Sequence, residues 1–236
     1  ELGKLEGKLL QEPQTPAQLL AELTAHLLQN DAVALQRYED RLSEMEEELL
    51  RAVEATGKPT VLVMINGRPN SINWADAHVD AIVEAWYPGA HGGQAVYEVL
   101  FGEYNPGGKL TVTFPRHVGQ IPFNFPYKPA ANTDGGITPG PGGNQTRING
   151  ALYDFGYGLS YTTFEYADLR IEPQTIRQDE PFRVSFDVTN TGQRDGDEVV
   201  QLYIHDVLSS VTTYEKNLRG FDRVHLKAGE TRRVTM

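Results

Sequence analysis

The segment from Tyr153 to Tyr166 constrains the fold most, because it separates two stretches of the chain with different hydrophobic periods. It reads YDFGYGLSYTTFEY and places four tyrosines and two phenylalanines around two glycines. Apolar residues come in continuous runs before it and alternate with polar residues after it. Continuous runs are typical of buried parallel strands, and alternation is typical of strands with one buried face. We therefore expect a hinge whose aromatic rings pack against structure on both sides.

Residues 58–127 carry the pattern of an α/β domain. The apolar runs 60–65 and 81–86 have the length of buried strands, and both end in glycine and proline turn residues. A helix is expected over 94–101, opened and closed by glycines, with a third strand over 110–114. Strand, helix and strand at this spacing predict the C-terminal part of an α/β sandwich domain with a largely parallel sheet.

Residues 1–57 are expected to form a helical hairpin ahead of this domain. Thr15 suits a helix N-cap, with proline following it, and Gly57 suits the final C-cap. Between Leu35 and Val53 apolar residues recur at alternating spacings of three and four, as in a coiled-coil seam. About two heptads are short for a coiled coil, so packing on its own domain is favoured over a zipper for a partner.

After the hinge, residues 162–236 predict an incomplete β-sandwich. Phe182, Val184, Phe186 and Val188 alternate with polar residues, and a second strand is expected over 199–204. The sequences Asn-Thr-Gly and Asp-Gly between them mark a turn. Asp195, Asp197 and Glu198 could suggest a calcium site, but their spacing does not match a calcium-binding loop, and the turn explains them better. About five strands fit, where a full sandwich of this type has about seven. The stretch 128–161, rich in Gly and Pro before the hinge, is expected to be a loop that links the two domains.

Composition excludes several classes of partner. The net charge of −11 and the pI near 5.0 argue against nucleic acid and anionic membranes. No apolar run reaches the roughly 18–20 residues that cross a bilayer. The chain has no cysteine, so disulfides and thiolate metal sites are excluded, and no metal or cofactor motif is found. It begins without Met and ends within an alternating pattern, so we expect a piece of a longer protein.

Polar and aromatic residues follow both strands expected in the α/β domain. Asn66 and Arg68 come after the first, and Trp86, Tyr87 and His91 come after the second. In parallel sheets ligands bind at the carboxyl ends of the strands. Amides and guanidinium groups suit hydroxyl groups, and aromatic faces suit the C–H faces of sugars. The alternative is structural: Trp86 belongs to the core, and Arg68 pairs with a surface carboxylate.

Six short blocks occur in series along the chain: ATGKP with VLVMINGRP, EAWYPG with a Gly-Gly pair, VLFGEYNPGGKL with TFP, VGQIP, FGYGLSY, and VTNTG with GDEVVQLYI. In this order they resemble the C-terminal half of glycoside hydrolase family 3, in particular bacterial β-glucosidases with a long loop such as 130–150. The resemblance implies that the sandwich is a fibronectin-III-like domain.

The resemblance also implies a function in carbohydrate catabolism. Members of this family hydrolyse β-glycosides from the non-reducing end with retention, using a carboxylate nucleophile and a second carboxyl group as acid and base. The nucleophile is an Asp in an N-terminal barrel domain, which is missing from this chain. The acid/base Glu follows a valine-rich strand in a Gly-Glu pair. An ungapped alignment places it near His26, where no such pair occurs.

We therefore predict no catalytic residue in this chain and no activity of the chain alone. Glu22 lies in a helical leucine pattern and is expected to be a solvated surface residue. The expected substrate of the complete enzyme is a β-linked glucoside or oligosaccharide, and the resemblance favours the periplasm or the cell exterior. The alternative is a non-catalytic structural or carbohydrate-binding module derived from the family.

Overall fold

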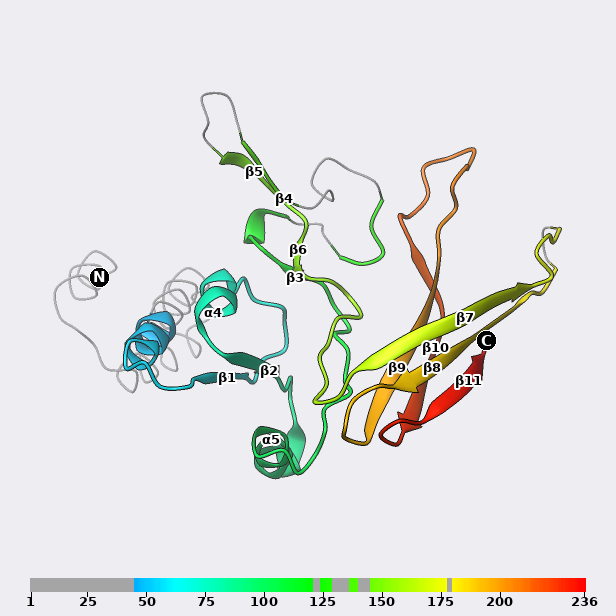
Figure 1. The fold of residues 1–236 in the computed structure, drawn as a ribbon. Coiled ribbons are helices and arrows are strands. Elements are labelled where there is room, and N and C mark those ends of the chain that lie inside the picture. Colours follow the sequence, from blue (N-terminus) through cyan, green and yellow to red (C-terminus); the bar gives the residue numbers. More distant parts are fainter. Residues whose placement is uncertain (1–44, 121–123, 129–135, 140–144, 178–179) are drawn as a thin grey trace. The chain divides into compact units, whose positions relative to one another are not determined.

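The computed structural model describes the chain except residues 1–44, 121–123, 129–135, 140–144 and 178–179, which are drawn in grey in Figure 1. The chain divides into two compact units, of which the second contains Val63–Trp74 and Val83–Met236. Most of the expected helical hairpin, including Thr15, Glu22 and His26, lies outside the described residues. Within the described part, no helix is both long and apolar enough to cross a membrane.

Residues 45–54 are helical, and this helix ends where the sequence predicts. The N–H of Gly57 donates a hydrogen bond of 2.9 Å to the carbonyl of Glu54. Gly57 has φ of 68°, the left-handed conformation that glycine adopts without steric cost. Gly57 is therefore the C-cap that the sequence indicates.

The α/β part begins with strand β1 (Val61–Met64), helix α4 (Asn73–His78) and strand β2 (Ala81–Glu84). β1 and β2 pair with each other (Figure 1). Thr60 accepts a hydrogen bond from the N–H of Asp80, and Met64 accepts one from Ala85, so the two strands run parallel, as predicted. Helix α4 was not expected from the sequence, because six residues are too few to show a helical period.

A 3₁₀ turn, η1 (Gly89–His91), leads into helix α5 (Gly92–Leu100), which confirms the expected helix with a start two residues earlier. It ends at Phe101, whose N–H donates to the carbonyl of Tyr97. The following Gly102 has φ of 74°, so it closes the helix in the left-handed conformation as expected.

The expected strand over 110–114 is wrong. Strand β3 covers only Phe114–Pro115 and pairs antiparallel with β6 (Ala151–Tyr153). Leu110 instead bonds to the hinge: its N–H donates to the carbonyl of Tyr157, and its carbonyl accepts from the N–H of Gly156, both at 2.7 Å. The backbone of this run is thus satisfied by a segment more than 40 residues downstream, which leaves it no place in the parallel sheet.

Two further features separate β3 from β6. A short 3₁₀ turn, η2 (Val118–Gln120), follows β3. The stretch expected to be a loop contains two antiparallel strands, β4 (Gly136–Pro139) and β5 (Gln145–Asn149), with Ile137 in register with Ile148. The expectation of a plain linker is therefore wrong for these residues. The domain boundaries at 128 and 162 stay predictions.

The C-terminal part is a β-sandwich with five described strands, as expected (Figure 1). They are β7 (Phe164–Glu172), β8 (Arg183–Asn190), β9 (Gly196–Ile204), β10 (Asn217–Leu226) and β11 (Thr231–Thr235). One sheet has the order β11-β8-β7 and the other pairs β10 with β9. All these pairings are antiparallel.

The core of the sandwich lies between the two sheets. Val184, Phe186 and Val188 on β8 are buried and alternate with residues that are less buried, which confirms the predicted period of two. Phe182 precedes β8 and is 37% exposed, so its assignment to this alternation is wrong. The buried cluster is completed from the other strands by Val200, Val224, Leu226 and Val234.

Asn190 holds the turn between β8 and β9. Its side chain is fully buried and accepts hydrogen bonds from the Thr162 hydroxyl (2.6 Å) and the Gly192 N–H (3.1 Å). Its amide group donates to the carbonyls of Arg194 (2.8 Å) and Leu226 (3.1 Å). A buried amide costs free energy unless it is paired, so these four bonds fix the turn that the sequence predicts.

The aromatic hinge contacts structure on both sides, as expected. Towards the α/β part, the ring of Tyr153 lies 6.1 Å from that of Phe114, and the Tyr161 hydroxyl donates to the carbonyl of Val99 in α5. Towards the sandwich, the guanidinium of Arg194 lies 5.7 Å from the Tyr161 ring centre, and the ring of Tyr166 packs 5.8 Å from that of Phe186.

Candidate functional site

The five residues singled out in the sequence lie on the segments after β1 and β2. Because these strands are parallel, both segments start at the same edge of the sheet. Arg68 and His91 are exposed, and among the described residues neither forms an ion pair or hydrogen bond with the other candidates. Arg68 forms no ion pair with a carboxylate of the described residues, and the surface pairing considered as its structural role stays a prediction.

Tyr87 and Gly67 bring the two segments into contact. A Cβ atom on Gly67 would lie 2.6 Å from both the Cε2 and the hydroxyl oxygen of Tyr87, so the ring rests against the bare glycine backbone. The Tyr87 side chain is nevertheless 78% exposed. This close approach explains the glycine in the Asn-Gly-Arg-Pro turn and leaves most of an aromatic ring facing solvent.

Glu84, the last residue of β2, belongs to this cluster and was missed in the sequence. Burial raises the pKa of its carboxyl, against the effect of hydrogen bonds from the Trp86 N–H and the Asn66 side chain. The Trp86 N–H donates to Oε1 at 2.9 Å. Glu84 Oε2 and Asn66 Oδ1 are buried without a hydrogen-bond partner in the described structure. The only sequence signal was a carboxylate at the end of an otherwise apolar run.

Trp86 turns inward rather than presenting its ring. It has φ of 50°, which is unusual for a bulky residue, and its ring centre lies 6.0 Å from that of Phe114. The indole is thus partly buried and contacts the buried ring of Phe114, and the choice between a core role and a sugar-stacking role for Trp86 stays a prediction. The cluster therefore offers one exposed ring, Tyr87, beside the paired amide and carboxyl of Asn66 and Glu84.

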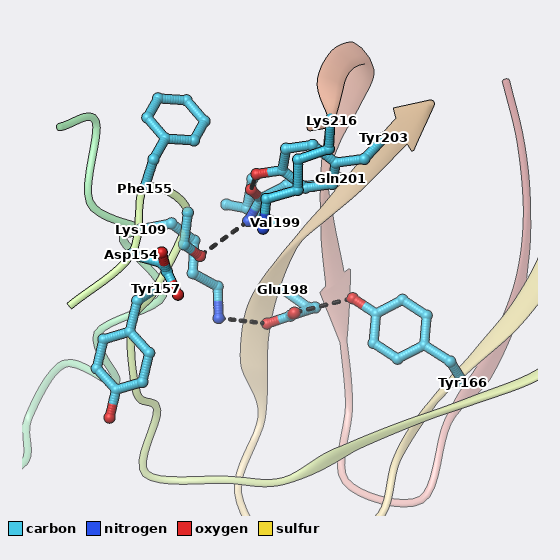
Figure 2. A pocket seen from close by; sticks show the side chains of 11 residues that line it. Lys109, Asp154, Phe155, Tyr157, Tyr166, Glu198, Val199, Gln201, Tyr203 and Lys216 are labelled. Atoms are coloured by element: carbon cyan, nitrogen blue, oxygen red, sulfur yellow. Dashed lines mark hydrogen bonds and ion pairs between the residues drawn. The ribbon is translucent and has the colours of Figure 1, made fainter. Parts of the chain in front are cut away.

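A second candidate site lies where the hinge meets the sandwich, and Figure 2 shows its lining. It is a pocket of about 300 Å³, which is at the lower end of the range for ligand pockets. Its lining comes mainly from the hinge, from β7 and from β9, as the labelled side chains show. Lys109, which precedes β3, and Lys216, which precedes β10, complete it. This site was not expected from the sequence, because its residues come from segments far apart in the chain.

An ion pair forms the floor of this hinge pocket. The Lys109 ammonium lies 3.0 Å from Oε2 of Glu198, and the two side chains are only 14% and 11% exposed. Oε1 of Glu198 accepts a hydrogen bond of 2.9 Å from the Tyr166 hydroxyl. Burial, with the charge of Glu198, raises the pKa of Tyr166 well above its ordinary value. The Lys109 ammonium also donates to the carbonyl of Gly158 at 3.0 Å, which ties the hinge to β9.

Gln201 and Tyr203 on β9 form the wall opposite the hinge. The Tyr203 hydroxyl donates to Oε1 of Gln201, and the Gln201 amide donates to the carbonyl of Gly156 at 3.0 Å. A Cβ on Gly156, which has φ of 84°, would lie 2.2 Å from Gln201 Oε1. The wall therefore depends on a glycine at this position.

Phe125 packs behind the pocket. Its ring stacks on Phe155 at 4.4 Å and meets the edge of Tyr203 at 5.7 Å. On the other side of the hinge segment, Tyr157 stacks on Tyr153 at 5.2 Å. These contacts fix the rings that line the pocket.

No metal centre accompanies either site within the described ranges, where no group of three or more His, Asp or Glu side chains is arranged to hold an ion. Asp195 and Asp197, considered as calcium ligands from the sequence, have structural partners. Asp195 accepts a hydrogen bond from the Ala228 N–H at 2.9 Å. Asp197 pairs with Arg223 and, at 2.7 Å, with His225.

A parallel strand pair, an aromatic hinge and a β-sandwich thus follow one another along the chain, and comparisons with known proteins identify the family to which this arrangement belongs. The model of the glycosyl hydrolase family 3 C-terminal domain matches residues 21–161, and that of the fibronectin type III-like domain matches residues 198–236. The chain belongs to glycosyl hydrolase family 3.

Several relatives are similar over most of this chain. A periplasmic beta-glucosidase of Salmonella typhimurium is 39% identical over 95% of the chain, and a beta-xylosidase of Formosa agariphila is 45% identical over 81%. Among solved structures, a β-glucosidase from Erythrobacter marinus aligns with 80% of the chain at 42% identity and a TM-score of 0.72. The chain spans only 31%, 26% and 24% of these three proteins, respectively.

Proposed function

We propose that this chain forms the C-terminal part of a retaining, exo-acting β-glycosidase, with a β-linked glucoside as substrate. The similarity of most of the chain to β-glucosidases and β-xylosidases carries this proposal. The carboxylate nucleophile would come from a barrel domain that precedes this region in the complete enzyme. The periplasmic relative favours the periplasm or the cell exterior as the compartment.

The segments after β1 and β2 would contribute contacts to the sugar. The exposed ring of Tyr87 provides a surface for the C–H face of a pyranose, and the Asn66 amide and Glu84 carboxyl provide hydrogen-bonding groups beside it. A sugar hydroxyl would supply the partner that Asn66 Oδ1 and Glu84 Oε2 lack in the described structure. Arg68 and His91 would contribute from the rim, where both are exposed.

Hydrolysis of p-nitrophenyl β-glucoside and β-xyloside by the purified chain tests the catalytic part of the proposal. We expect no turnover above the buffer rate, because the nucleophile is supplied from outside these residues. Turnover that disappears in Glu22→Gln would refute this assignment.

The sequence of the gene upstream of Glu1 distinguishes the enzyme from the non-catalytic module. A barrel domain with an Asp nucleophile supports the glycosidase, and an unrelated domain or an in-frame start supports the structural or carbohydrate-binding module.

The sugar-contacting role is tested by fluorescence of Trp74 and Trp86 during a titration with glucose. Asn66→Ala is expected to abolish the change, whereas Asn70→Ala in the same exposed turn is the matched control and leaves it intact. An identical titration curve for Asn66→Ala and the unmodified chain would contradict the role of this amide.

A further inference from the structure

We propose that the hinge pocket is a binding site for a single neutral sugar ring, held between Asp154 of the hinge and Lys216, which immediately precedes β10. Only the choice of sugar rests on the function proposed above. The pocket lies wholly in described residues of one compact unit, and neither the family matches nor the sequence assigned it a role.

The charges that line the pocket balance. Two lysines, 109 and 216, face two carboxylates, 154 and 198. Lys109 and Glu198 neutralise each other at 3.0 Å, so the floor attracts neither an anion nor a cation. A phosphate or a polyamine would therefore gain little there, whereas an uncharged ligand avoids the cost of separating the pair.

Asp154 and Lys216 are the charged lining groups that take no part in this ion pair, and the Lys216 ammonium lies over the Tyr203 ring. Neither side chain forms a hydrogen bond or ion pair with another residue in the described part of the chain, and Figure 2 shows them on different walls of the pocket. Asp154 is close enough to Tyr203 to raise the pKa of that phenol, after the larger effect of burial. A carboxylate accepts hydrogen bonds and an ammonium donates them, so together they complement vicinal hydroxyl groups.

Four of the uncharged lining residues are aromatic, and they stand beside Gly156, Val199 and Gln201: Phe155, Tyr157, Tyr166 and Tyr203. Phe155 and Tyr203 are each held on one side by Phe125, and the Lys216 ammonium lies 5.1 Å from the Tyr203 ring centre. Rings fixed in this way cost little entropy when a ligand packs against them. Aromatic walls with a few convergent polar groups suit a pyranose, which has apolar C–H faces and a rim of hydroxyl groups.

The test is a titration of the full ¹⁵N-labelled chain with methyl β-glucoside and methyl β-xyloside, followed by NMR. We expect saturable shifts in the amides of the hinge and β9, with a Kd on the order of 1 mM. Asp154→Asn and Lys216→Met each remove one charged partner and should raise Kd at least about tenfold. Asp206→Asn and Lys227→Met, at exposed positions outside the lining, are the matched controls and leave Kd unchanged.

Three outcomes would overturn the proposal. They are no saturable shift with either glycoside, an unchanged Kd in both pocket variants, and tighter binding of glucuronate or glucose 6-phosphate than of the neutral glycosides. Circular dichroism verifies folding, and the shift map of the unmodified chain decides the question if a variant does not fold. The readout is binding without turnover, so failure here leaves the proposed glycosidase function standing.

Discussion

Lys109→Met tests whether the buried ion pair holds the sandwich to the hinge. At 3.0 Å, the attraction between Lys109 and Glu198 is about 5 kcal/mol for an effective dielectric constant of about 20, before desolvation is subtracted. Removing the ammonium leaves the Glu198 carboxylate, 11% exposed, with only the Tyr166 hydroxyl as a partner. Loss of one partner of a buried pair costs about 3–5 kcal/mol, and the residual exposure places our expectation near 3 kcal/mol.

The assay is urea unfolding of the full chain, with the free energy of unfolding extrapolated to water. The same loss should lower the melting temperature by about 6–12 °C for a chain of this size. The double variant Lys109→Met, Glu198→Gln buries no unpaired charge, so it should recover at least half of the loss. Arg232→Met is the matched control, because its pair with Glu230 is 47% and 33% exposed and solvent screening leaves such a pair little effect on stability.

Two results would refute this reasoning. One is a change in the free energy of unfolding below about 0.5 kcal/mol for Lys109→Met. The other is a double variant whose loss equals the sum of the two single losses, since that would show that the two groups do not interact.

Three further perturbations follow from the same structure. Gly158→Ala places a Cβ 2.3 Å from the carbonyl oxygen of Gly108 and should cost about 3 kcal/mol in urea unfolding, whereas Gly93→Ala, in open space on α5, should be neutral or stabilising. Asn190→Ala removes the four bonds of the β8–β9 turn and should cost about 3 kcal/mol by the same assay; a loss under 1 kcal/mol would contradict it. The pKa of Tyr166 is higher in the folded chain than in the unfolded chain. The free energy of unfolding should therefore be unaffected by this group below about pH 10 and should decrease as the pH rises further. The decrease should be smaller in Tyr166→Phe.

The sandwich was the part of the fold most accessible from sequence. The alternation of Val184, Phe186 and Val188 reports one buried face directly, and Asn190 marks the turn because its amide pairs locally. The run from Leu110 looked like a strand but bonds to the hinge at Gly156 and Tyr157. Its partners are distant in sequence, and periodicity carries no information about them.

The sites were less accessible for the same reason. Asn66 and Tyr87 could be anticipated because polar and aromatic residues follow apolar strands, but the inward turn of Trp86 depends on an unusual backbone conformation that no residue type announces. Glu84 is the last residue of β2, and residue type alone does not show that burial raises the pKa of its carboxyl or that the Asn66 side chain bonds to it. The hinge pocket combines Lys109, the hinge and β9, which are distant in the sequence and come together only in the folded chain.

The hinge contacts mean that the sandwich is not an interchangeable module. Its border with the preceding structure runs through shared side chains: Glu198 is bonded to Lys109, Gln201 to Gly156, and Tyr203 meets Phe125. A shortened chain that stops before β7 would leave a buried lysine without its counter-ion and aromatic rings open to water. Insertion of a foreign sandwich after the hinge would do the same. Replacement of the sandwich would therefore also need matching changes at Lys109, Phe125 and Gly156, the residues that receive it.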